Sequence, residues 1–99
     1  MEQKIKQIFD ALHKIAENTP AVTKIFLFGS RARGDNQKKS DIDLAILATN
    51  ITTHEWLDLC EKIEQLDTLL EIDIIKFDEA SKQLQNKILQ EGVTIYERR

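Results

Sequence analysis

The sequence has one cysteine and no long apolar run, and each shortage excludes a class of protein. Because Cys60 is the only cysteine, the chain can form no internal disulfide, cysteine-rich zinc site or iron–sulfur cluster. No apolar stretch approaches the roughly 18 residues that a membrane-spanning helix requires. The opening residues MEQKIKQIFD contain no apolar core of a secretory signal. We therefore expect a cytoplasmic protein that has no membrane partner.

The chain also lacks an excess of positive charge. Its 14 Lys and Arg residues stand against 17 Asp and Glu residues, which gives a net charge of −3. A module that binds duplex DNA usually carries a strongly basic face, so we expect no duplex DNA partner, although a small basic patch around one phosphate stays open. With 99 residues, of which 41% are hydrophobic, the chain can bury one modest core, and we expect a single domain over residues 1–99.

Helices and strands are predicted to alternate along the chain. Apolar residues recur at helical spacing over residues 5–16 and again over 53–70, where Thr52 and Glu55 fit a capping box. The predicted strands are 23–28, 41–48 and 71–77. They are followed by a final helix, capped by Asp78 and ended by Gly92, and by a short last strand over 93–96. This α-β-(turn)-β-α-β-α order, with only about a dozen residues between the first two strands, favours an α/β (α+β) fold with a mixed sheet flanked by helices.

Two carboxylates stand at the start of the second predicted strand. Asp41 and Asp43 are two positions apart, and such residues point to the same face of a strand. Carboxylate oxygens are hard ligands suited to Mg²⁺ or Mn²⁺, and two like charges at the end of an apolar strand favour a compensating cation. The ordinary alternative for an isolated Asp-x-Asp is a solvated face.

The loop between the first two strands favours the metal-site interpretation. Gly29 and Ser30 directly follow an apolar strand, and glycine together with a hydroxyl and backbone N–H groups can hold a phosphate. Arg31 and Arg33 stand beside them, and arginine binds phosphate through charge-assisted hydrogen bonds. A phosphate cradle followed by metal-binding carboxylates is a coherent site for a nucleoside triphosphate.

A third carboxylate is expected from the neighbouring strand. Asp73 is our preferred candidate because it lies in an isoleucine-rich strand, where an unpaired charge would be costly. Glu71 has the same parity but stands at the start of the strand, and Asp78 follows the strand and suits a helix cap better.

The run Phe28-Gly29-Ser30-Arg31-Ala32-Arg33-Gly34, followed by Ser40-Asp41-Ile42-Asp43-Leu44-Ala45, resembles the signature of the polymerase β-like nucleotidyltransferases. Ten residues separate the Gly-Ser pair from Asp-x-Asp. The short chain is most similar to the minimal nucleotidyltransferases (MNT proteins) of toxin–antitoxin pairs. The resemblance implies a polymerase β-like fold and transfer of a nucleoside monophosphate, AMP from ATP, to a hydroxyl. It also implies a HEPN-type helical toxin as partner, with a tyrosine as the acceptor.

The resemblance implies a role for each site residue. Asp41 and Asp43 would hold two Mg²⁺ ions, with Mn²⁺ as a substitute, and Asp73 would complete one metal site and help activate the attacking hydroxyl. The implied nucleotide-binding residues are Gly29, Ser30, Arg31 and Arg33. Since 99 residues offer a shallow pocket for the base, we expect a partner or a second copy, in a homo- or hetero-oligomer, to complete it.

Other functions stay open at this point. A binding-only antitoxin would neutralise a HEPN partner by occlusion without catalysis, and interface residues carry no motif that could exclude it. A glycosyltransferase that uses Asp-x-Asp and Mn²⁺ usually needs a longer chain and gives the Gly29-Ser30 pair no role. A P-loop kinase is disfavoured because the sequence contains no GxxxxGK[ST]. The nucleotide preferred, the acceptor and the oligomeric state do not follow from the residues alone.

Overall fold

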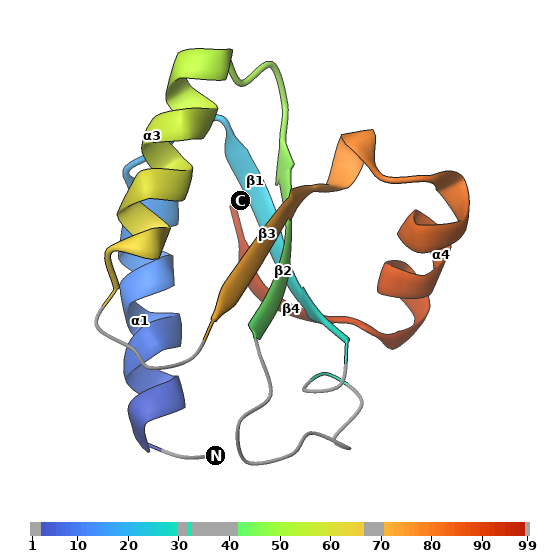
Figure 1. Ribbon diagram of the computed structural model, residues 1–99, viewed down its shortest axis with the longest axis horizontal. Coiled ribbons are helices and arrows are strands. Elements are labelled where there is room, and N and C mark those ends of the chain that lie inside the picture. Colours follow the sequence, from blue (N-terminus) through green and yellow to red (C-terminus); the bar gives the residue numbers. More distant parts are fainter. Residues whose placement is uncertain (1–2, 30–31, 33–41, 67–70, 99) are drawn as a thin grey trace.

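A computed structural model describes residues 3–29, 32, 42–66 and 71–98. Four strands, three helices and one short 3-10 helix follow one another in the described part of the chain (Figure 1). They are α1 (Gln3–Glu17), β1 (Val22–Phe28), β2 (Ile42–Ala48), α3 (Thr53–Glu64), β3 (Ile72–Lys76), η1 (Phe77–Glu79), α4 (Lys82–Glu91) and β4 (Val93–Glu97).

The strands form one mixed sheet in the order β3-β2-β1-β4. β1 runs antiparallel to both β2 and β4, whereas β2 and β3 run parallel. The two most apolar strands, β1 and β2, are therefore interior, as their continuous apolar runs predict. The predicted mixed sheet flanked by helices is confirmed, and the short last strand extends the sheet beside β1.

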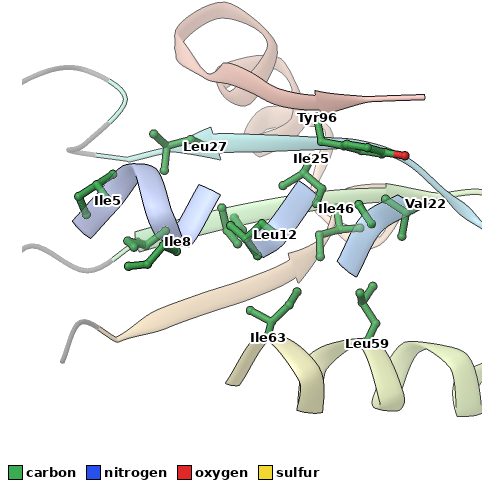
Figure 2. Packing of buried hydrophobic residues seen from close by; sticks show 13 residues of the cluster. Ile5, Ile8, Leu12, Val22, Ile25, Leu27, Ile46, Leu59, Ile63 and Tyr96 are labelled. Carbon is green, nitrogen blue, oxygen red and sulfur yellow. The ribbon is translucent and has the colours of Figure 1, made fainter. Parts of the chain in front are cut away.

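Helices cover the two faces of the sheet unequally. α1 and α3 lie together on one face, and α4 alone lies on the other (Figure 1). Figure 2 shows Leu59 and Ile63 of α3 pointing toward the sheet and toward Leu12 of α1, where all three side chains are almost fully buried. Ile42, Leu44 and Ile46 belong to the same cluster, whose β2 members follow the alternation of a strand. Among the described residues, no helix has the length and apolar character needed to cross a membrane.

The α4 face has a much smaller core. Phe26, Ala45 and Ile88 are its buried members. Five partly buried side chains pack around them: Phe28, Leu47, Ile75, Phe77 and Leu84. Among the described residues, this face therefore holds a thinner apolar layer than the face covered by α1 and α3.

The helix termini confirm one predicted cap and correct two expectations. Thr52 and Glu55 form the predicted capping box, and the hydrogen bond from the Thr52 backbone N–H lowers the pKa of the Glu55 carboxyl. The helix that they open ends at Glu64 rather than Leu70, with Gln65 as its C-cap. Asp78 does not cap the last helix: it lies in η1, and the Ser81 hydroxyl accepts the capping hydrogen bond from the Leu84 N–H. The 3-10 turn that follows β3 uses the residues that the sequence assigned to the cap.

Arg98 ties the end of β4 to the turn between α1 and β1. Its guanidinium Nε donates to the carbonyl oxygen of Val22 at 2.9 Å, and Nη2 donates to that of Ala16 at 2.7 Å. Nη2 also lies 3.4 Å from the carbonyl oxygens of Glu17 and Thr19. The cation thus satisfies carbonyl groups at the C-terminus of α1, where a positive charge is favoured by the helix dipole.

We predict that Arg98→Ala lowers the free energy of unfolding by about 2–4 kcal/mol, because two short charge-assisted hydrogen bonds to the carbonyl oxygens of Val22 and Ala16 are lost. Urea unfolding followed by circular dichroism measures the loss. The control is Lys24→Gln, which removes only an exposed ion pair with Glu97 (Nζ to Oε2, 3.5 Å) and should cost under about 1 kcal/mol. Equal losses in the two variants would show that the Arg98 hydrogen bonds add nothing.

Candidate active site

The structure describes three of the seven predicted site residues and brings them to one end of the sheet. Gly29 follows the last residue of β1, Asp43 is the second residue of β2, and Asp73 is the second residue of β3. The remaining four lie outside the described residues: Ser30, Arg31, Arg33 and Asp41. Because β1 runs against β2 and β3, its C-terminal end meets their N-terminal ends.

Asp43 and Asp73 are direct neighbours across the sheet. Their Cα atoms are register partners in the parallel β2–β3 ladder. Both residues have the parity of the strand positions that pack against α4, so both carboxylates stand on the thinly covered face. The predicted convergence of a carboxylate from the neighbouring strand with the Asp-x-Asp strand is thus present in the backbone.

The sequence-based argument for Asp73 assumed a buried strand position, and this assumption was wrong. The isoleucine-rich strand β3 is an edge strand, and Asp73 is exposed, so the cost of burying a charge does not apply to it. Glu71 precedes β3 and is also exposed, and Asp78 lies beyond the opposite end of the strand. Register with Asp43, rather than burial, distinguishes Asp73 from the other two carboxylates.

Gly29 is required at its position by both conformation and space. Its φ of +78° is a left-handed conformation that residues with a side chain rarely adopt. A Cβ atom on Gly29 would overlap Oδ2 of Asp43 and would lie 3.3 Å from Cγ of the same side chain. The absent side chain therefore makes room for the Asp43 carboxylate. The sequence suggested glycine for close approach of a phosphate and gave no sign of this contact.

The carboxylates fit a divalent cation. Two carboxylates from adjacent strands supply hard oxygen ligands on one face of the sheet, which is the donor chemistry that Mg²⁺ prefers. In the described part of the chain no group of three or more His, Cys, Asp or Glu side chains is placed to hold a metal ion. The sequence places a further carboxylate, Asp41, two residues before Asp43, which is the same-face spacing along a strand.

Cys60, in contrast, lies far along α3 and shows no chemical activation. It is partly buried, and burial raises the pKa of its thiol. A raised pKa keeps the sulfur protonated at neutral pH and makes it a poor nucleophile. This agrees with its position within the apolar periodicity of residues 53–70.

Comparison with known protein families decides the identity of the fold. Residues 3–99 match the family described as Polymerase beta, Nucleotidyltransferase. The chain belongs to this family. The match includes the Gly-Ser pair, the Asp-x-Asp strand and Asp73, so the motif that carries the resemblance lies within the nucleotidyltransferase domain.

Comparison with individual proteins shows which relatives the chain resembles. Over 85 residues the chain is 29% identical to the protein adenylyltransferase MntA of Shewanella oneidensis, a match that covers 83% of this chain and 59% of that protein. The chain thus spans less than two thirds of that relative's length. A crystal structure of a toxin–antitoxin with AMP-PNP is similar at a TM-score of 0.72 and 26% identity, covering 92% of this chain and 74% of that one.

A second solved structure shares the fold. It is the tri-AMPylated Shewanella oneidensis HEPN toxin in complex with MNT antitoxin, and the match has a TM-score of 0.67 at 23% identity. It covers 94% of this chain and 72% of that chain. At this identity the likeness supports the polymerase β-like nucleotidyltransferase fold alone.

Proposed function

We propose that this protein is a Mg²⁺-dependent nucleotidyltransferase that moves AMP from ATP to the hydroxyl of a tyrosine on a HEPN-type toxin and thereby acts as its cytoplasmic antitoxin. The observation that carries the proposal is the convergence of Gly29, Asp43 and Asp73 at one end of the sheet. This is the position that a phosphate-binding turn and metal-binding carboxylates need in order to act on the same triphosphate.

The reaction assigns a separate task to each part of the site. The acceptor oxygen forms a bond to the α-phosphorus of ATP, the bond from that phosphorus to the β-phosphate oxygen breaks, and pyrophosphate leaves. The proton of the acceptor hydroxyl passes to the Asp73 carboxylate. In this proposal Gly29 and Ser30 bind the β- and γ-phosphates through backbone N–H groups and the serine hydroxyl. Arg31 and Arg33 stabilise the negative charge that grows on the leaving pyrophosphate.

Asp41, Asp43 and Asp73 would hold the divalent cations. Two such ions, when bound, supply charge that neutralises the triphosphate and stabilises the attacking and leaving oxygens together. The carboxylates orient these ions, and the Asp43 position depends in turn on the missing side chain at Gly29.

Support for the donor and the acceptor comes from the relatives. The Shewanella relative is named a protein adenylyltransferase, one similar structure contains AMP-PNP, and another contains an AMPylated HEPN toxin beside an MNT antitoxin. Adenine as the base, a protein as acceptor and a HEPN protein as partner are therefore the identities that we propose for this chain.

The test is intact-mass spectrometry of a candidate HEPN partner, to be sought first among the products of the neighbouring genes. The partner is incubated with this protein, Mg²⁺ and each of the four nucleoside triphosphates in turn. We expect its mass to rise by one or more AMP units with ATP alone, and we expect EDTA or the Asp41→Ala/Asp43→Ala double variant to prevent the shift. A partner that is neutralised by this double variant without any mass shift would instead identify a binding-only antitoxin.

A further inference from the structure

A groove lies along the C-terminal part of β3, and its lining on that strand begins at Ile74, one residue after Asp73. β3 is the terminal strand of the sheet, and in the described part of the chain no other strand pairs with its outer edge. A groove of about 320 Å³ is lined by both Ile74 and Ile75. Because successive strand residues point to opposite faces, a groove that both of them line must pass across the edge of the strand.

The walls of this β3-edge groove come from elements on both faces of the sheet. Trp56 of α3 lines one side, and Ala80 and Leu84 line the other. The Lys76 ammonium lies 5.0 Å from the ring centre of Trp56 and 3.4 Å from Oε2 of Glu79. The groove therefore offers apolar contacts on both sides of the outer edge of β3.

The hydrogen-bonding direction of the β3 backbone follows from one backbone contact with β2. The Ile42 N–H donates to the Glu71 carbonyl at 2.9 Å, so the backbone groups of residue 71 turn toward β2. Since this direction alternates along a strand, Asp73 and Ile75 also turn toward β2, whereas Ile74 and Lys76 turn their N–H and C=O groups outward. The outward groups are those that face the groove.

The order of residues across the sheet shows which substrate reaches this edge. Gly29, Asp43 and Asp73 follow one another from β1 through β2 to β3. An in-line displacement places the attacking and leaving oxygens on opposite sides of the α-phosphorus. With pyrophosphate leaving over the phosphate-binding turn at Gly29, the acceptor hydroxyl must approach from the side of Asp73, where no further strand pairs with β3 in the described part of the chain.

We propose that an extended segment of the acceptor protein binds along the outer edge of β3 as an added strand and thereby presents its hydroxyl residue to Asp73. This inference rests on the proposed function and deepens it, because it assigns a binding surface and a conformation to the acceptor. Backbone hydrogen bonds to Ile74 and Lys76 hold the segment, and an apolar side chain of the segment packs between Trp56 and Leu84. The modified tyrosine accordingly lies in an extended segment rather than within a helix.

Lys76 provides a matched pair of variants that tests the backbone contact. The φ of Lys76, −82°, is close to the value that a proline ring fixes, and proline is tolerated on edge strands. Lys76→Pro therefore removes the outward N–H with little conformational cost. Lys76→Gln removes the same charge and keeps the N–H. We expect kcat/KM for AMP transfer to the HEPN partner to be about tenfold lower in Lys76→Pro than in Lys76→Gln, mainly through KM, because only the N–H differs between the two variants in its ability to bind the segment.

Titration with a fluorescent ATP analogue and Mg²⁺, which should give unchanged affinity in both variants, separates acceptor binding from nucleotide binding. Equal transfer rates for the proline and glutamine variants would overturn the proposal. Absence of any transfer by the wild-type protein would instead contradict the proposed function itself.

A second measurement uses the wild-type protein and does not depend on the folding of a variant. Hydrogen exchange by NMR compares the backbone amides of β3 with and without the HEPN partner. We expect the Ile74 and Lys76 amides to exchange rapidly in the free protein and to become at least tenfold slower in the complex, while Asp73 and Ile75 are slow in both. Unchanged exchange at Ile74 and Lys76 in a saturated complex would rule out strand addition at this edge.

Discussion

Asp43→Asn should reduce AMP transfer by roughly a thousandfold or more while the protein remains folded, since the carboxylate acts on charge at the reacting centre. Asp43 is the register partner of Asp73, and asparagine keeps its shape but supplies no negative charge for a cation. The loss should therefore appear in kcat and in Mg²⁺ dependence rather than in stability. Quenched-flow or mass-based rates at saturating ATP and varied Mg²⁺ measure both quantities.

Variants of other carboxylates test whether the loss of AMP transfer is specific to the candidate site. Asp73→Asn should produce a comparable loss of transfer. Glu71→Gln, two residues earlier with the same parity, should stay within about threefold of wild type, because Glu71 does not lie opposite Asp43 in the register. Asp10→Asn, at an exposed position on α1, controls for net charge. If Glu71→Gln were as inactive as Asp73→Asn, the third carboxylate would be wrongly assigned.

Gly29→Ala is expected to impair both stability and transfer. Alanine at a φ of +78° costs about 1–2 kcal/mol, and its Cβ must also displace the Asp43 carboxylate or the end of β1. We expect the free energy of unfolding to fall by about 2–3 kcal/mol. Transfer should fall by about a hundredfold or more, because a displacement of about 1 Å at a reacting group is costly.

A double-mutant cycle separates the two causes of this stability loss. In an Asp43→Ala background the added Cβ no longer meets a carboxylate, so Gly29→Ala should retain the conformational cost and lose the steric one. Urea unfolding of the four proteins gives the coupling energy, expected at about 1 kcal/mol. A coupling near zero would mean that the contact between Gly29 and Asp43 does not strain the folded protein.

Much of the fold could be predicted because periodicity reports which face of an element is buried. The alternation of Ile42, Leu44 and Ile46 and the helical stripe of α1 both follow the observed core. The end of α3 was less predictable, because the apolar spacing continues to Leu66 after the helix has ended at Glu64. Asp78 and Ser81 are both good caps, and only the 3-10 turn after β3 decides between them.

The site was predictable to the extent that strand parity and neighbouring strands determine it. Asp73 does lie beside Asp43 on the neighbouring strand, and its role stays a prediction. Its exposed edge position depends on the sheet order, which the sequence does not show. The contact between Gly29 and Asp43 needs the exact register of two antiparallel strands. The roles of Asp41, Ser30, Arg31 and Arg33 stay predictions, since these residues lie outside the described part of the chain.

The outer edge of β3, with which no strand pairs in the described part of the chain, also affects self-association. An uncovered strand edge is a template on which a second copy of the chain can pair, and charged side chains on such a strand oppose this. β3 is only five residues long, and Asp73 and Lys76 are its two charged residues. We therefore expect the proposed catalytic carboxylate of Asp73 also to oppose edge-to-edge aggregation. Purified Asp73→Asn protein should therefore self-associate at lower concentration than wild type, and the HEPN partner should restore its solubility by covering the edge.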